Sequence, residues 1–173
     1  MAKTAKKSPK RKTTKSRMKS PHRSRASAPA GRKAVRQSFG FGGNAPVPIS
    51  LAVRAGDYVF VSGLADHFFR PEEVTFDASG EIISDGSGGG LGPIGEQTRG
   101  TLTKIQEVLA QAGCTLDDVV DMIVWLREPR DFVGFNETYK QFFKTAQPAR
   151  AVLRNEMMFT TRIEIKVIAY KPL

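Results

Sequence analysis

The segment 162–170, RIEIKVIAY, restricts the fold of this chain more than any other, because apolar and charged residues alternate through most of it. Side chains of a β-strand point alternately to opposite faces, so this pattern predicts a strand with one face against a core. The apolar face carries Ile163, Ile165 and Val167, and the opposite face carries Arg162, Glu164 and Lys166. The chain must therefore build a sheet whose apolar face is covered.

Two further segments predict neighbouring strands. The run VVDMIVWL at 119–126 has too few polar residues for a half-exposed strand, so we expect a central strand covered on both faces. The run YVFVSG at 58–63 is rich in β-branched and aromatic residues and ends at a turn residue. Residues 49–53 can pair with it across RAGD, so we expect a hairpin at this point, preceded by a flexible entry over residues 39–46.

Two segments carry apolar residues at helical spacing. The first follows the glycine-rich stretch GSGGGLGPIG, begins near Glu96 and ends at Gly113. The second begins at Asp131, which we predict to be its N-cap residue. The apolar positions are Leu102, Ile105, Val108, Leu109 and Ala112 in the first helix, and Phe132, Phe135, Tyr139, Phe142 and Phe143 in the second.

These segments follow one another as two strands, a helix, a strand, a helix and two strands. A chain of 173 residues is long enough for one ordinary domain and an extension. We therefore predict an α+β fold over residues 37–173, with a single mixed β-sheet and two helices packed on one of its faces.

Residues 1–36 differ from the rest of the chain in charge. They hold 8 Lys and 6 Arg and no Asp or Glu, which leaves 13 basic and 17 acidic residues, a net charge of −4, for the remainder. With almost no large apolar side chain, we expect this basic tail to be disordered. It can contact nucleic acid or another polyanion without sequence specificity, act as an organellar targeting segment, or serve as a solvating tail; the charge favours the first.

Histidine and cysteine are scarce, which limits the chemistry. Cys114 is the one cysteine, so no internal disulfide can form and we expect a reduced, cytoplasmic location. No apolar run approaches the length of a membrane helix, so we expect no membrane partner. His22 and His67 give neither a metal cluster nor a catalytic triad, so catalysis must use carboxylates, arginines, hydroxyls or backbone groups, with no metal or cofactor.

Three polar residues are candidates for a site. Arg150 stands in QPARAVL between Pro148 and an apolar pair, where it is either a member of a structural ion pair or a clamp for a carboxylate. Glu164 lies among like-facing charges, which on pattern alone favours a solvated face of the sheet. Asn136 most simply faces solvent or satisfies a helix end.

Five stretches occur in the order found in the reactive-intermediate deaminase family (RidA, or YjgF-like): YVFVSG, EQTRGTLTKIQEVLAQAGCTLDDVV, DFVGFNETYKQFF, PAR and IEIKVIA. This resemblance covers most of residues 47–171. It implies a chorismate-mutase-like fold that forms a homotrimer, with small-molecule sites in the clefts between neighbouring subunits. The implied activity is hydrolysis of reactive enamine and imine intermediates of amino acids to 2-oxo acids and ammonia.

The resemblance also implies roles for individual residues. Arg150 would hold the substrate carboxylate at two points, and Glu164 would position a water molecule and take its proton. The implied substrate-binding residues are Asn136, Arg150, Val152, Ser62 and Gly63. Imines hydrolyse spontaneously, so this chemistry demands no metal or cofactor.

Two positions depart from the family pattern. Ile49 replaces an aromatic hydroxyl near the first strand, and Val152 replaces a common cysteine after PAR. The thiol is absent at Val152, although a backbone contact there would survive. These departures favour an alternative, a non-catalytic carboxylate-binding or regulatory protein of the same fold. A third alternative, a nucleic-acid-associated protein, rests on the basic tail alone.

We predict that deletion of residues 1–36 abolishes retention on DNA or RNA, because the remaining chain has a net charge of −4. Binding by the full chain should weaken steeply with salt, since counterion release drives it. Electrophoretic mobility shifts at two salt concentrations measure this, and a chain whose 14 tail Lys and Arg residues are replaced by Ser is the control for tail length. Retention by the truncated chain would contradict the prediction.

Overall fold

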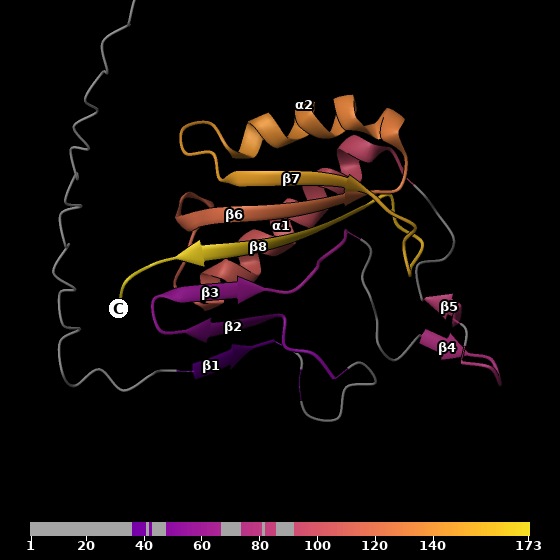
Figure 1. Ribbon diagram of the computed structural model, residues 1–173, viewed down its shortest axis with the longest axis horizontal. Coiled ribbons are helices and arrows are strands. Elements are labelled where there is room, and N and C mark those ends of the chain that lie inside the picture. Colours follow the sequence, from indigo (N-terminus) through magenta and orange to yellow (C-terminus); the bar gives the residue numbers. More distant parts are fainter. Residues whose placement is uncertain (1–35, 41, 43–47, 67–73, 81, 86–91) are drawn as a thin grey trace, which may run out of the picture. The chain divides into compact units, whose positions relative to one another are not determined.

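The computed structural model describes residues 36–40, 42, 48–66, 74–80, 82–85 and 92–173 (Figure 1). All of them belong to one compact unit that spans residues 33–173. The predicted disordered tail lies outside the described residues except for Arg36, and so do His22, His67 and most of the glycine-rich stretch before the first helix.

The fold is α+β, as predicted, with a six-stranded sheet in the order β1-β2-β3-β8-β6-β7 (Figure 1). Strands β6 and β7 are parallel and the other neighbours are antiparallel, so the sheet is mixed. Strands β4 and β5 form a separate two-stranded sheet. The bounds are β1 Arg36–Phe39, β2 Ala52–Ala55, β3 Tyr58–Val61, β4 Val74–Phe76, β5 Ile82–Asp85, α1 Ile94–Gln111, β6 Val119–Leu126, α2 Phe132–Phe142, β7 Ala149–Arg154 and β8 Ile163–Tyr170, with short 3-10 turns at Leu116–Asp118 and Pro129–Asp131.

The two predicted helices are α1 and α2, which contact each other and cover one face of the sheet. Figure 1 shows α1 running behind the strands. Helix α1 ends before Gly113, whose φ of 72° is a conformation that favours glycine. The core between helices and sheet contains Leu102, Ile105, Leu109, Phe135, Met122, Val124, Ile163, Ile165 and Val167.

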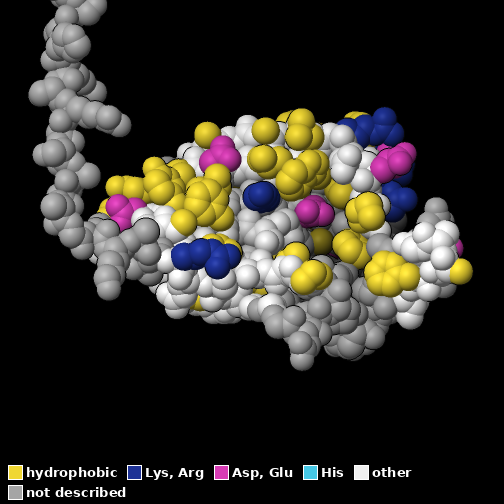
Figure 2. All heavy atoms as spheres, turned by 60° about the horizontal axis from the view of Figure 1, so that its bottom comes forward, with side chains coloured by type: hydrophobic (Ala, Val, Ile, Leu, Met, Phe, Trp, Pro, Cys, Tyr) yellow, Lys and Arg dark blue, Asp and Glu magenta, His cyan; other side chains and the backbone are white. Residues whose placement is uncertain are grey.

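The open face of the sheet corrects one expectation. Strand β6 buries one side completely, but its other side is only half covered within this chain, and Val120 is 44% exposed. Predicted burial on both faces is therefore wrong for the single chain. Large apolar side chains stay exposed on neighbouring strands as well, and Figure 2 shows such side chains gathered on one face with few charged ones among them. They are Tyr58 and Phe60 of β3, Leu153 of β7 and Tyr170 of β8.

The first hairpin forms, but its limits differ from those predicted. Strand β2 begins at Ala52 and continues through Ala55, so Gly56 and Asp57 alone make the turn. Strand β1 begins at Arg36, the last residue of the predicted disordered tail, ends at Phe39, where the flexible entry was predicted to start, and pairs along β2. Its residues Arg36–Phe39 are mostly polar and exposed, because they lie at the edge of the sheet, and edge strands lack the apolar pattern that identifies a strand in a sequence.

Asp131 occupies the predicted N-cap position of α2, but its side chain makes no capping hydrogen bond. Its carboxylate instead accepts two hydrogen bonds from Arg162, from Nε at 2.9 Å and from Nη2 at 2.7 Å. Asp131 is only 4% exposed. Since Arg162 is the residue before β8, this ion pair joins the start of α2 to the start of β8, and Arg162 is not a freely solvated charge like Lys166.

We predict that Arg162→Gln lowers the free energy of unfolding by about 2 kcal/mol or more, because it leaves a buried carboxylate without its cation. Lys171→Gln is the matched control, since Lys171 is 42% exposed in its ion pair with Asp118 and should cost less than about 1 kcal/mol. Urea denaturation measures both variants. Equal decreases in the free energy of unfolding for the two variants would contradict the prediction that the buried ion pair stabilises more than the exposed one.

Candidate functional site

Arg150 lies near the start of β7, on the face of the sheet that the helices cover. It pairs in register with the buried Met122 of β6. Its guanidinium carbon lies 4.5 Å from the centre of the Tyr139 ring and 5.1 Å from that of Phe135, both on α2. Both rings lie on the side of the helix that the apolar pattern of the sequence predicts, but nothing in the sequence indicates that they hold Arg150.

The hydrogen bonds of Arg150 are incomplete. Its Nη2 donates to Oδ1 of Asn136 at 2.9 Å, and Nδ2 of Asn136 donates to the carbonyl of Phe132 at 2.8 Å. Its Nη1 is buried and has no acceptor. No carboxylate of the described residues pairs with Arg150, in contrast to Arg162. The structural ion pair that the sequence left open is therefore not formed within the described part of the chain.

Glu164 lies on β8 opposite Trp125, and strand alternation directs it to the open face of the sheet. Its side chain is half-buried rather than solvated, and burial raises the pKa of its carboxyl group above the usual range. Gly63 explains how the carboxylate fits, because a Cβ at position 63 would overlap it. The sequence predicted both residues for the site without indicating this contact.

Ser62 and the residues beside it place Gly63 next to β8. The Ser62 hydroxyl donates to the carbonyl of Ser50 at 2.7 Å, and Leu64 forms a two-way backbone bridge with Ile165 at 2.9 Å. This hydroxyl is thus engaged in holding the loop. Val152, two residues after Arg150 on β7, packs partly buried against the core on the helix-covered face.

The predicted site residues form two groups on opposite faces of one sheet. Arg150, Asn136 and Val152 lie on the helix-covered side. Glu164, with Gly63 beside it, lies on the open side. A single site that uses Arg150 and Glu164 together therefore cannot form within one chain.

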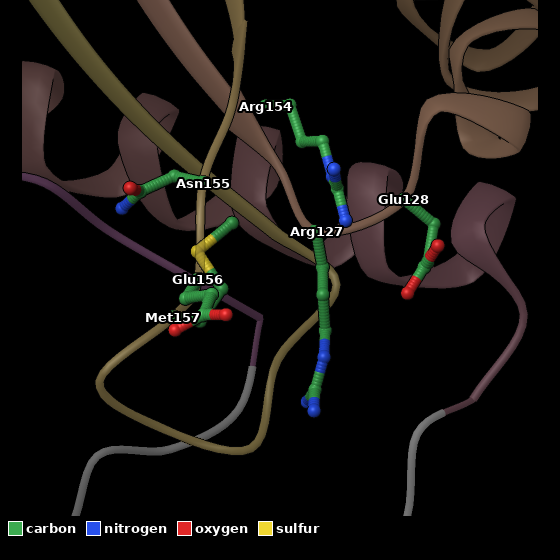
Figure 3. A pocket seen from close by; sticks show the side chains of 6 residues that line it. All are labelled: Arg127, Glu128, Arg154, Asn155, Glu156 and Met157. Carbon is green, nitrogen blue, oxygen red and sulfur yellow. The ribbon is translucent and has the colours of Figure 1, made fainter.

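A polar hollow of about 510 Å³ lies where β6 and β7 end (Figure 3). None of the predicted site residues lines it. Figure 3 shows Arg127, Glu128 and Arg154 on one side, with the chain of residues 155–157 on the other. These charged groups are largely exposed, so we regard the hollow as a solvated surface feature. A smaller hollow, about 340 Å³, lies beside Arg54 at the end of α1.

In the part of the chain that the structure describes, no three His, Cys, Asp or Glu side chains lie together so as to hold a metal ion. No described helix combines the length and the apolar composition that a membrane span requires.

Similarity to known proteins supports both the fold described above and the family resemblance that the sequence motifs indicate. The family described as Endoribonuclease L-PSP matches residues 43–171. The chain belongs to this family. It is the YjgF or RidA family whose motifs the sequence contains.

Three relatives in the YjgF/RidA family illustrate the likeness. A RutC family protein of Pyrococcus horikoshii is 36% identical over 133 residues, 74% of this chain and 93% of that protein. The 2-iminobutanoate/2-iminopropanoate deaminase of Bos taurus is 37% identical over 124 residues, 70% of this chain and 79% of that enzyme. The crystal structure of a YjgF/YER057c/UK114 family member from Mycobacterium tuberculosis has a TM-score of 0.59 and 26% identity, with 79% of this chain and 99% of that chain covered.

We predict that Gly63→Ala moves the Glu164 carboxylate outward and returns its raised pKa toward the ordinary 4.5, because the new Cβ occupies its place. The fold should persist, since the far end of a flexible side chain can yield. Titration of the Glu164 carboxyl carbon by NMR measures the pKa. Gly92→Ala is the control, since its Cβ would lie 3.8 Å from Glu96. An unchanged pKa in Gly63→Ala would contradict this packing.

Proposed function

We propose that this protein hydrolyses the imine and enamine forms of amino-acid-derived 2-oxo acids, releasing the 2-oxo acid and ammonia. The observation that carries the proposal is the guanidinium of Arg150, which has a buried Nη1 without an acceptor and no carboxylate partner among the described residues. The name of the bovine relative, 2-iminobutanoate/2-iminopropanoate deaminase, agrees with such a substrate.

A carboxylate is the ligand that best completes Arg150. A buried donor without an acceptor costs about 1–3 kcal/mol, so an incoming acceptor gains that amount in addition to its own attraction. The planar guanidinium matches the two oxygens of a carboxylate. Because Asn136 accepts a hydrogen bond from Arg150 and donates to Phe132, we assign it to orienting the guanidinium beside the substrate.

Hydrolysis then needs a water molecule at the carbon of the C=N bond. Glu164 takes a proton from this water as the water oxygen bonds to the carbon, and passes that proton to the nitrogen. Glu164 then moves the hydroxyl proton of the carbinolamine to the amine, so that the C–N bond breaks, ammonia leaves and the oxygen becomes the carbonyl of the 2-oxo acid. A half-buried carboxylate with a raised pKa suits this proton transfer near neutral pH.

The two groups of residues meet in this proposal only between two copies of the chain. The open face that carries Glu164 also bears Tyr58, Phe60 and Tyr170 toward the C-terminal end of β8, an apolar surface that another subunit would cover. We propose the homotrimer that the family resemblance implies, with Glu164 of one subunit facing Arg150 of its neighbour. The replacements at Ile49 and Val152 leave the clamp and the base in place, which favours the enzyme over the non-catalytic alternative.

A coupled assay tests the proposal. We generate 2-aminoacrylate enzymatically and expect the wild-type protein to accelerate release of the 2-oxo acid. Arg150→Ala should lower kcat/KM by about a hundredfold, the scale for losing one partner of a buried charged contact. Arg99→Ala, which removes an exposed arginine that bonds only Gln141 in the described residues, should change nothing. No acceleration across a panel of amino-acid imines would sink the enzymatic proposal.

Glu164→Gln should lower kcat by about a hundredfold, the usual scale for a general base, while a 2-oxo acid still binds. The wild-type rate should rise with pH through a limb that lies above the ordinary glutamate pKa of 4.5, since only the deprotonated carboxylate takes the proton. The glutamine variant should lack this limb. Full activity of Glu164→Gln would show that Glu164 is not the general base.

A further inference from the structure

The aromatic side of α2 is the strongest feature that the proposed function leaves unused. We propose that the Tyr139 ring, with Phe135 beside it, is a positioning surface that fixes the plane of the Arg150 guanidinium for carboxylate binding. This inference rests on the proposed function, because it concerns the same arginine. Tyr139 acts on the substrate through Arg150 and is therefore a positioning residue.

Three rings of α2 and its end form the surface. Phe143 stacks beneath Tyr139 with centroids 4.6 Å apart and planes 20° apart, and Phe135 lies tilted beside Tyr139 at 5.6 Å and 46°. All three are 5% exposed or less. Because their neighbours hold the rings from below and from the side, Tyr139 presents a rigid face to the sheet.

Arg150 is restrained in two directions on this surface. The rings of Tyr139 and Phe135, at 4.5 and 5.1 Å, limit movement of its guanidinium toward α2. The Asn136 amide limits rotation of the guanidinium through the 2.9 Å bond to Nη2. A guanidinium held in this way loses little freedom when it binds a carboxylate, which strengthens binding without a new contact.

The ring of Tyr139, and not its hydroxyl, carries this role. Burial raises the pKa of the Tyr139 hydroxyl, and the nearby Arg150 opposes that shift. The hydroxyl therefore stays protonated at neutral pH, so it offers Arg150 no negative charge. Phenylalanine should consequently replace tyrosine, whereas leucine, with similar apolar character but no π face, should not.

Binding of 2-oxobutanoate, a product-like acid that does not react, tests the role. We expect Tyr139→Leu to weaken the Kd by about tenfold, the upper range of a partly desolvated cation–π contact. Tyr139→Phe should stay within about twofold of wild type. Leu109→Ala is the control for stability, because Leu109 is fully buried in the same core but lies on α1 and has no contact with the Arg150 guanidinium among those described. It should lower the thermal midpoint at least as much as Tyr139→Leu and leave the Kd unchanged.

A double-mutant cycle separates positioning from stability. In an Arg150→Lys background the ammonium cannot lie flat on the ring, so Tyr139→Leu should weaken binding by less than about twofold more. An equal loss in both backgrounds, or a weaker Kd in Leu109→Ala, would show a merely structural role and overturn the inference.

An NMR measurement on the ligand-free protein tests the positioning role of Tyr139 independently of the proposed enzymatic function. The Nε–H proton of Arg150 should show an upfield ring-current shift by NMR in wild type and in Tyr139→Phe, and a smaller one in Tyr139→Leu, where only the Phe135 ring remains. If 2-oxobutanoate does not bind the wild type but this shift behaves as expected, the proposed function fails and the positioning surface stands. If the shift is unchanged in Tyr139→Leu, the positioning surface is wrong whatever binds.

Discussion

Burial of one face of the six-stranded sheet under α1 and α2 is the constraint on which the other features depend. Alternation along β8 sends Ile163 and Ile165 into that core and leaves Glu164 on the opposite side. The same alternation on β7 turns Arg150 toward the rings of α2. One sheet thus separates a cation from a carboxylate, and this separation requires that any site using both be shared between subunits.

Three partly buried arginines differ in the groups that accept hydrogen bonds from their guanidinium. Arg162 has a bidentate carboxylate partner in Asp131, which ties α2 to β8. Arg54, 5% exposed, donates to the Ala112 carbonyl at the end of α1 and to that of Lys171, where the negative end of the helix dipole offsets its charge. Arg150 has an amide, two rings and an unused donor. The first two arginines stabilise the fold, and the third keeps the donor to which we propose that the substrate carboxylate binds.

Much of the fold followed from local pattern. The run at 119–126 is β6 at its predicted limits, and the apolar positions of α1 are buried as expected. The edge strand β1 escaped prediction because its mostly polar residues carry no period-two signal. Asp131 stands at its predicted N-cap position, but the sequence did not reveal that its carboxylate binds Arg162, because that partner is 31 residues away and helix-capping rules consider only neighbours in sequence.

The sequence by itself determined the two-sided strand, the two helices, the family and the identity of Arg150 and Glu164 as candidates, because periodicity and motif are properties of consecutive residues. The tertiary structure alone decided which faces these residues occupy and what surrounds them. The stacking of Arg150 on Tyr139 and the fit of Glu164 against Gly63 join segments far apart in the chain. Such contacts depend on how β7 packs against α2 and on how the segment after β3 packs beside β8. These arrangements form only when the whole core is packed.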